Sequence, residues 1–394
     1  MLEPRSHSRD IEARLLERNP HFAQLFDREA PRLAEACREM SDRFLRGGRL
    51  LAFGQGPYAT DAQHVAVEFV HPVIVGKRAL PGLDLSIYFR PWIEAIVTSD
   101  DMVMGFGPPQ GDAEVQAALA VARARGAMTF ALPGVDATYS LEATSRDPFI
   151  HQELVEVLYH VLWESVHVFL EHRTLGHDVG EAAFLYPFLG RETHDARDLA
   201  TQIAQSIGTK VADDAQLRTQ VAAEESDNIW EAAVLIHQSV SRGGKLVIFG
   251  NGGSATDAND LAIDCVAPPH GYTPIPAVSL SLEPASLTAI ANDVGVEVIF
   301  LRQLIAHGAT GDVAFAISTS GGSRNVIAAL EEARKRGMRS VALLGYDGGE
   351  IKRRGLADVV IVVRSDYIPR IQEVQASIYH ILRETLEALR HGTH

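Results

Sequence analysis

The chain is poor in cysteine and has no long apolar segment, and each scarcity excludes a class of protein. Its 394 residues contain two cysteines, Cys37 and Cys265, without a CxxC pair. This argues against a disulfide framework and fits a reducing compartment. The first residues, MLEPRSHSRD, are polar and charged, unlike a secretory signal. Because no run of about 18 apolar residues occurs, we expect no membrane span and predict a cytoplasmic protein.

Positive charge is also scarce. The chain has 36 Lys and Arg against 51 Asp and Glu, a net charge of −15. Nucleic acid and anionic membranes would repel such a protein, so neither is expected as a main partner. A local pocket for a small phosphate stays open as an alternative. The length exceeds one ordinary hydrophobic core, which predicts two domains.

The sequence contains the same element twice. RLLAFGQGPYATDAQH at 49–64 aligns without a gap with KLVIFGNGGSATDAND at 245–260. Further along, YHVLWE at 159–164 matches YHILRE at 379–384, in the same order. A repeat this long is a duplicated domain rather than a solenoid unit. We predict one domain at 1–172, a Gly- and Pro-containing linker at 173–198 and a second domain at 199–394.

Each half alternates short apolar runs with amphipathic stretches, as expected for a parallel sheet covered by helices on both faces. The pattern is clearest in the second half. Strands are predicted at 245–250, 276–282, 312–318, 340–345 and 358–363, and helices at 213–241, 250–266, 285–295, 323–337 and 370–390. The fold class is therefore α/β.

Two loops of the second half have the composition of a phosphate site. The loop 250–254, GNGGS, and the loop 318–323, STSGGS, each lie between a strand and a helix. Glycines let the backbone approach an anion, and N–H groups at a helix start bind it. A single loop of this kind is commonly an ordinary turn with a Ser cap. Two in one domain favour phosphate. Neither contains the Lys of GxxxxGK[ST], so no nucleotide cofactor is expected.

These motifs resemble a known family. GNGGSATDA, SLTAIANDVG, ISTSGGSRNV and RIQEVQASIYHILRE are together similar to the sugar isomerase (SIS) domain, in particular to phosphoheptose isomerases, which act on sedoheptulose 7-phosphate. The resemblance runs through most of 200–390 and is weaker in the first half. It implies two flavodoxin-like three-layer α/β/α sandwiches in tandem. It also implies a homodimer that forms a pseudo-tetramer of SIS domains, because single-domain members of the family are usually tetramers.

The family motif GNGGSAxDAQHxxxE and a closing helix supply a His, a Glu, a Gln and a second His. Carried onto this chain, the first half supplies all four, as His64, Glu68, Gln152 and His160. The two pairs have helical spacing that places each on one helix face. Two imidazoles, a carboxylate and an amide oxygen could bind zinc. They could equally be an acid/base pair that moves a proton between adjacent sugar carbons.

Each half departs from the motif in a different place. The first half has Gln55-Gly56-Pro57-Tyr58 and a Pro-rich loop ending in Asp112 where the phosphate loops would be. Proline removes N–H donors, and a carboxylate repels phosphate. The second half keeps both loops, Gln372 and His380, but has Asp260 and Asp264 in place of His and Glu. The Arg that follows in the family is absent from both halves.

The expected function is aldose–ketose isomerisation of a phosphorylated sugar, a heptose 7-phosphate by resemblance, in a composite site to which both domains contribute. Chemistry is assigned to His64, Glu68, Gln152, His160 and His380, and the metal to the first four of these. Phosphate and substrate contacts are assigned to Asn251, Gly252, Gly253, Ser254, Asp293, Ser318, Thr319, Ser320, Ser323 and Gln372. The alternative is a protein that binds sugar phosphates without turnover, as a sensor or a protein-binding adaptor.

Overall fold

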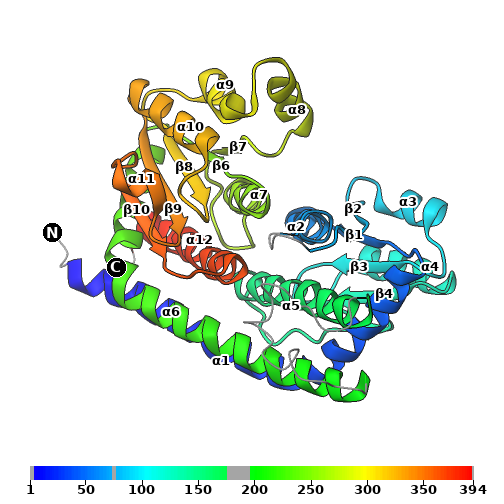
Figure 1. Ribbon diagram of the computed structural model, residues 1–394. Helices are drawn as coiled ribbons and strands as arrows, with labels where there is room; N and C mark the ends of the chain where they lie inside the picture. Colours follow the sequence, from blue (N-terminus) through cyan, green and yellow to red (C-terminus); the bar gives the residue numbers. More distant parts are fainter. Residues whose placement is uncertain (1–3, 73–76, 175–195, 393–394) are drawn as a thin grey trace. The chain divides into compact units, whose positions relative to one another are not determined.

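The computed structural model describes residues 4–72, 77–174 and 196–392. The chain forms two compact units, each with its own sheet (Figure 1). The first unit is Asn19–Asp213, and the second unit combines Met1–Arg18 with Asp214–His394. The second unit therefore contains the N-terminal residues as well as the C-terminal half.

The first unit contains one parallel sheet. Its elements, in chain order, are β1 (Leu50–Gly54), a short 3-10 helix (Gly56–Tyr58), α2 (Ala59–Val70), β2 (Gly82–Asp84), α3 (Phe89–Ile96), β3 (Met102–Phe106), α4 (Ala113–Ala124), β4 (Met128–Leu132), β5 (Tyr139–Ser140) and α5 (Pro148–Thr174). The strand order is β2-β1-β3-β4-β5, with every pairing parallel.

The second unit repeats this arrangement. Its elements are β6 (Leu246–Phe249), α7 (Gly253–Val266), β7 (Ala277–Ser279), α8 (Pro284–Asp293), a 3-10 helix (Val296–Val298), α9 (Ile299–His307), β8 (Val313–Ser318), α10 (Arg324–Lys335), β9 (Arg339–Gly345), α11 (Gly349–Arg353), β10 (Val359–Val363) and α12 (Ile368–His391). Read from β7, the order β7-β6-β8-β9-β10 is that of the first sheet. It is also the strand order of flavodoxin-like folds.

Alternate residues of each strand pack on opposite faces of the sheet, which produces three layers. On β1, Leu50 and Ala52 belong to a core with α2 and α5, whereas Leu51 and Phe53 pack with α3 and α4 on the other face. Strand β6 does the same, with one face toward α7 and α12 and the other toward α9 and α10. The predicted α/β/α architecture is confirmed in both halves.

The predicted strands of the second half are all present, and its predicted helices are found with small shifts of their ends. The short helices α9 and α11 were not predicted, because nine and five residues are too few for a helical period to show. The helix predicted at 213–241 is the end of a much longer one, α6 (Ala196–Val240).

Two long helices each contribute to both units. Helix α1 (Pro4–Leu45) places Ile11 and Leu15 in the core of the second unit, while its later residues pack in the first. Helix α6 places Ile203 and Ile207 in the first core and continues into the second unit. The predicted domain boundaries of 172 and 199 thus do not coincide with the limits of these compact units. Most of the predicted linker, 175–195, lies outside the described residues, and its two ends are helical.

Among the helices that the structure describes, none is both long enough and apolar enough to cross a membrane.

Candidate active site

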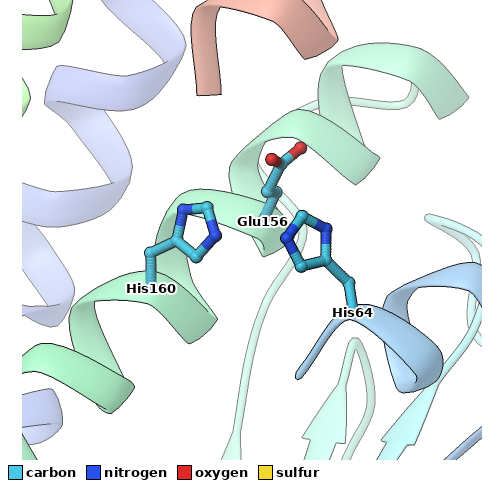
Figure 2. Close-up of side chains that lie close together, drawn as sticks. All are labelled: His64, Glu156 and His160. Atoms are coloured by element: carbon cyan, nitrogen blue, oxygen red, sulfur yellow. The ribbon is translucent and has the colours of Figure 1, made fainter. Parts of the chain in front are cut away.

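Helices α2 and α5 of the first unit bring three potential metal ligands together. His64 comes from α2, and Glu156 and His160 come from successive turns of α5 (Figure 2). One ligand atom from each lies within 4.8 Å of the other two, and all three side chains are buried. The two imidazole rings are nearly perpendicular to each other, at an interplanar angle of 76°, with centroids 5.2 Å apart.

The other two predicted ligands of this half lie beside the cluster. Glu68 follows His64 by one turn of α2, and its Oε1 is 3.9 Å from His64 Nε2. The Gln152 amide instead donates to Thr60 Oγ1 at 3.2 Å and to Asp61 Oδ2 at 3.4 Å. The structure therefore groups His64, His160 and Glu68, and directs Gln152 toward the beginning of α2.

Glu156 was not predicted as a site residue, because it is not part of the family motif. The structure nevertheless places its carboxylate with the imidazoles of His64 and His160. Gln152, Glu156 and His160 are each one turn apart on α5, so spacing alone could have identified it. The matching position in α12 is Ala376, which means that this carboxylate belongs to the first unit alone.

The donor set suits zinc. Two imidazoles and one carboxylate are a common three-ligand set for catalytic zinc, with a fourth position open. Tetrahedral zinc places its ligand atoms about 3.4 Å apart, which three ligand atoms within 4.8 Å of one another can reach by small movements of their side chains. The cluster fits a metal by chemistry and is compatible with one by distance.

The predicted phosphate loops lie side by side at one edge of the second sheet. Strands β6 and β8 are parallel neighbours, so the loops 250–254 and 318–323 both leave their carboxyl ends. In this strand order, β6 and β8 flank the point where the direction of winding reverses, which is where open α/β sheets bind ligands. Helices α7 and α10 begin here with Gly252 and Ser323 at their N-caps, and neither N-cap makes a side-chain hydrogen bond within the described part of the chain.

A pair of amides joins the two loops. Asn251 Nδ2 donates to Asn325 Oδ1, and Asn325 Nδ2 donates back to Asn251 Oδ1, both at 2.9 Å. Asn325 Oδ1 also accepts from the N–H of Val326 in the first turn of α10. The side chain of Asn251, predicted as a substrate contact, is thus used to hold the loops together.

Glycine is required at two positions of this edge. Gly252 has φ +58°, and a Cβ there would meet nothing within 4 Å, so it leaves open space above the start of α7. Gly321 also has φ +58°, and a Cβ there would lie 2.2 Å from the carbonyl oxygen of Gly348. Gly252 thus leaves the start of α7 accessible to a ligand, and Gly321 allows the loop to pack closely against the backbone of Gly348.

A cavity of about 830 Å³ is lined in part by Ser320 and Gly322 of the loop 318–323. Of the predicted phosphate and substrate residues, its lining includes Ser320 alone. Its charged lining is mixed, and consists of Arg353, Arg364, Asp347, Glu350 and Asp366. With three carboxylates against two guanidiniums, the cavity is less suited to a phosphate than the helix starts.

The corresponding loops of the first unit are closed to an anion. Asp112 is the N-cap of α4, and its Oδ1 accepts from the N–H groups of Glu114 and Val115 at 2.8 and 3.0 Å. A carboxylate thereby occupies the donors that a phosphate would use. At the other loop, Pro57 lies in the 3-10 helix that precedes α2.

The second unit also assembles a titratable cluster, which the sequence did not predict. Asp260 and Asp264 of α7 and His380 of α12 have ligand atoms within 4.8 Å of one another. Gln372 is buried on the same helix as His380. Asp293, predicted as a substrate contact, is instead the exposed last residue of α8 and accepts from the Asn292 amide.

Comparison with known proteins agrees with this architecture. Residues 211–345 match the family model described as the SIS domain. The phosphoheptose isomerase of Thermodesulfovibrio yellowstonii is 41% identical over 187 residues, which are 47% of this chain and 92% of that protein. The similarity to such isomerases lies in the second half of the chain.

Two solved structures share the double arrangement over nearly the whole chain. The C-terminal domain of glucosamine-fructose-6-phosphate aminotransferase from Francisella tularensis covers 96% of each chain with a TM-score of 0.63 and 9% identity. The tagatose-6-phosphate ketose/aldose isomerase of Escherichia coli covers 97% of this chain and 94% of its own, with a TM-score of 0.55 and 13% identity. At such identities these likenesses concern the fold alone. The chain belongs to the SIS domain family, and its second half is homologous to phosphoheptose isomerases.

Proposed function

We propose that the protein isomerises a phosphorylated sugar between its aldose and ketose forms, and that its two units divide the work. The proposal rests on a difference between equivalent positions of the two units: each unit keeps one part of the expected site and has lost the other. The second unit keeps open, uncapped helix starts at 252 and 323, whereas the first blocks the corresponding start with Asp112. The first unit keeps two imidazoles and two carboxylates at the junction of α2 and α5.

The phosphate group is assigned to the second unit. The N–H groups at the starts of α7 and α10, with the hydroxyls of Ser254 and Ser323, supply donors and a positive helix end. Phosphate contacts remote from the reacting carbons provide binding energy that positions those carbons. Sedoheptulose 7-phosphate is the proposed substrate because the similarity in this half is to phosphoheptose isomerases.

Proton transfer is assigned to the first unit. Glu68 takes the proton from the carbon next to the carbonyl, and His160 gives a proton to the carbonyl oxygen, which produces a cis-enediol. Return of the proton to the neighbouring carbon and loss of the second hydroxyl proton complete the isomerisation without any external oxidant. Both side chains are buried, and low access of water strengthens such transfers.

A metal would change the role of His160. His64, Glu156 and His160 would hold it, and a divalent ion there would polarise the carbonyl oxygen. His160 Nε2 cannot coordinate an ion and donate a proton from the same atom. The metal version of the proposal therefore leaves Glu68 as the proton carrier and needs a different acid.

The test is an isomerase assay on sedoheptulose 7-phosphate together with metal analysis of the same preparations. Wild type and His64→Ala are compared. Zinc and turnover that are both present in wild type and both absent in the variant would support the metal version. Turnover without metal would support direct acid/base catalysis by Glu68 and His160. Binding of the sugar phosphate without turnover would refute the enzyme and leave the sensor or adaptor.

A further inference from the structure

A second cavity of the second unit lies where α6 ends beside the last turns of α12. Its volume is about 420 Å³, which is within the range of about 300–1,000 Å³ that is usual for small-molecule sites. Besides these two helices, the segment that precedes β7 contributes to its lining. The lining residues are His237, Val240, Ser241, Ile275, Leu386 and Arg390. None of them is assigned to the isomerase reaction.

Two phenylalanines fill the equivalent place in the first unit. The alignment of 49–64 with 245–260, extended without a gap in both directions, pairs Phe44 with Val240 and Phe69 with Cys265. The two rings are buried in the first core, with centroids 5.8 Å apart. Cys265 adjoins the cavity, because its carbonyl oxygen accepts from the N–H of Ile275 at 2.7 Å. The second unit therefore has two small side chains where the first has two aromatic rings.

A cation has replaced an apolar side chain at the same place. The alignment of YHVLWE with YHILRE, extended along both helices, pairs Arg390 with Leu170, which is buried in the first core. Arg390 is exposed, so its guanidinium is accessible to a ligand. The neighbouring carboxylate of Glu387 is paired with Arg383 and His391 at 3.1 and 2.8 Å. The six lining residues include no carboxylate, although the chain as a whole has a net charge of −15.

The cavity thus has an apolar base and a polar rim. Ile275 and Leu386 at the base are buried, whereas Ser241 and Arg390 at the rim are exposed. His237 lies beside Ser241, with its Nε2 3.5 Å from the hydroxyl oxygen. A guanidinium can bind a carboxylate through two parallel hydrogen bonds, and an apolar base favours a hydrocarbon chain over water. The complementary ligand has a carboxylate at one end and an aliphatic chain at the other.

We propose that this cavity binds an aliphatic carboxylate. The hydrocarbon chain lies against Val240, Ile275 and Leu386. The carboxylate group pairs with Arg390 at the rim. The site belongs to the second unit, because the ring of Phe44 occupies the corresponding space in the first. The inference does not depend on the proposed isomerase activity, since it concerns binding at a different place.

Isothermal titration calorimetry of octanoate into the full chain tests the proposal. One octanoate per chain should bind with a Kd below about 1 mM, a modest affinity for a ligand of this size. Hexanoate should bind about tenfold more weakly, because two fewer methylenes are buried. No binding of octanoate, or equal affinity for the two acids, would overturn the proposal.

Two variants that copy the first unit locate the site. Val240→Phe introduces the ring of Phe44 and should abolish measurable octanoate binding, because it fills the apolar base. Arg390→Leu copies Leu170 and should weaken octanoate binding about fivefold, since a charge-assisted hydrogen bond is lost. Arg302→Leu removes an exposed arginine of α9 and is the control, with wild-type affinity expected.

Thermal unfolding without octanoate separates loss of the site from loss of the fold. Arg390→Leu should keep the wild-type Tm, because the replaced side chain is exposed. It therefore tests the site even if the larger ring of Val240→Phe disturbs the packing. Wild-type affinity for octanoate in either folded variant would refute binding at this cavity.

Discussion

Helices α4 and α10 occupy the same place in the two units, yet one begins with a carboxylate and the other with a hydroxyl. Asp112 folds back onto the first N–H groups of α4, while Ser323 leaves those of α10 without a side-chain cap in the described structure. The backbone path is kept in both. A ligand site can therefore be lost by filling its donors from within, and the fold gains a helix cap in the process.

The junction of α2 with α5 and the junction of α7 with α12 also share a backbone arrangement and differ in their side chains. The first has two imidazoles and the carboxylates of Glu68 and Glu156, and the second has two shorter carboxylates and one imidazole. A tyrosine precedes the histidine of the closing helix in both, as Tyr159 and Tyr379. The scaffold around each cluster is shared, so differences in chemistry come from a few side chains.

The most damaging change should be His160→Ala. If the first unit performs proton transfer, kcat should fall by about 10²- to 10⁴-fold, the usual contribution of a positioned acid or base. Steady-state assays with sedoheptulose 7-phosphate measure it. His167→Gln, two turns further along α5, is the control and should keep wild-type kcat. Wild-type kcat in His160→Ala would reverse the assignment of the two units.

An exchange of helix caps tests the other half of the comparison. Ser323→Asp copies Asp112 into the second unit and should raise KM about 100-fold, because a carboxylate would occupy the phosphate donors and repel the ligand. The folded state should be retained, since Asp is as good an N-cap as Ser. The reciprocal Asp112→Ser should leave KM unchanged. If both variants shift KM alike, the phosphate does not bind at α10.

The amide pair that joins the second unit's loops should have a smaller effect. Asn251→Ala and Asn325→Ala should each raise KM about tenfold, because either change lets the two helix starts separate. The double variant should be little worse than either single one, since both remove the same contact. Fully additive effects would show that Asn251 contacts the substrate directly.

The smallest expected effect concerns acid stability. The connection that follows α2 is tied to α5 by His167, whose ring nitrogens lie 2.9 Å from the carbonyl oxygens of Trp163 and Arg78. At the equivalent position of α12, Glu387 accepts from Thr273 N and Oγ1 at 2.8 Å. Burial lowers the pKa of His167, although the two carbonyls oppose the shift. Burial opposes ionisation of Glu387 too, but its hydrogen bonds hold the pKa at about 2.

The two ties should therefore fail in different pH windows. A His pKa below its ordinary 6.5 means that the unfolded chain binds more protons as pH falls, so the first unit loses stability below about pH 6.5. The lowered pKa of Glu387 stabilises the second unit above about pH 4.5, and this is lost as pH falls toward 2. Denaturant unfolding of His167→Gln and Glu387→Gln between pH 2 and 7 checks this. Each variant should reduce the pH dependence of the free energy of unfolding only in the pH range assigned to the residue it replaces. A change in the same pH range for both variants would contradict the assignment.

The sequence was enough to predict the duplication, the strand pattern and the two loops of the second half, because these depend on local composition. It did not predict the role of Glu156, since this carboxylate has no counterpart at Ala376 and lies outside the family motif. In the sequence, Asp260 and Asp264 are only departures from that motif, because the meaning of two short carboxylates depends on what α12 places opposite them. The use of Asn251 to hold Asn325 likewise depends on the pairing of β6 with β8.

The two long helices also affect how the chain can be divided. Residues 1–18 belong to the unit completed by the C-terminal half, and residues 199–213 belong to the unit begun by the N-terminal half. During synthesis, the first unit lacks part of its cover until α6 has left the ribosome. A cut between α5 and α6 would yield two pieces that each hold a helix the other needs. Such pieces are suited to act as a split protein, inactive alone and restored by mixing.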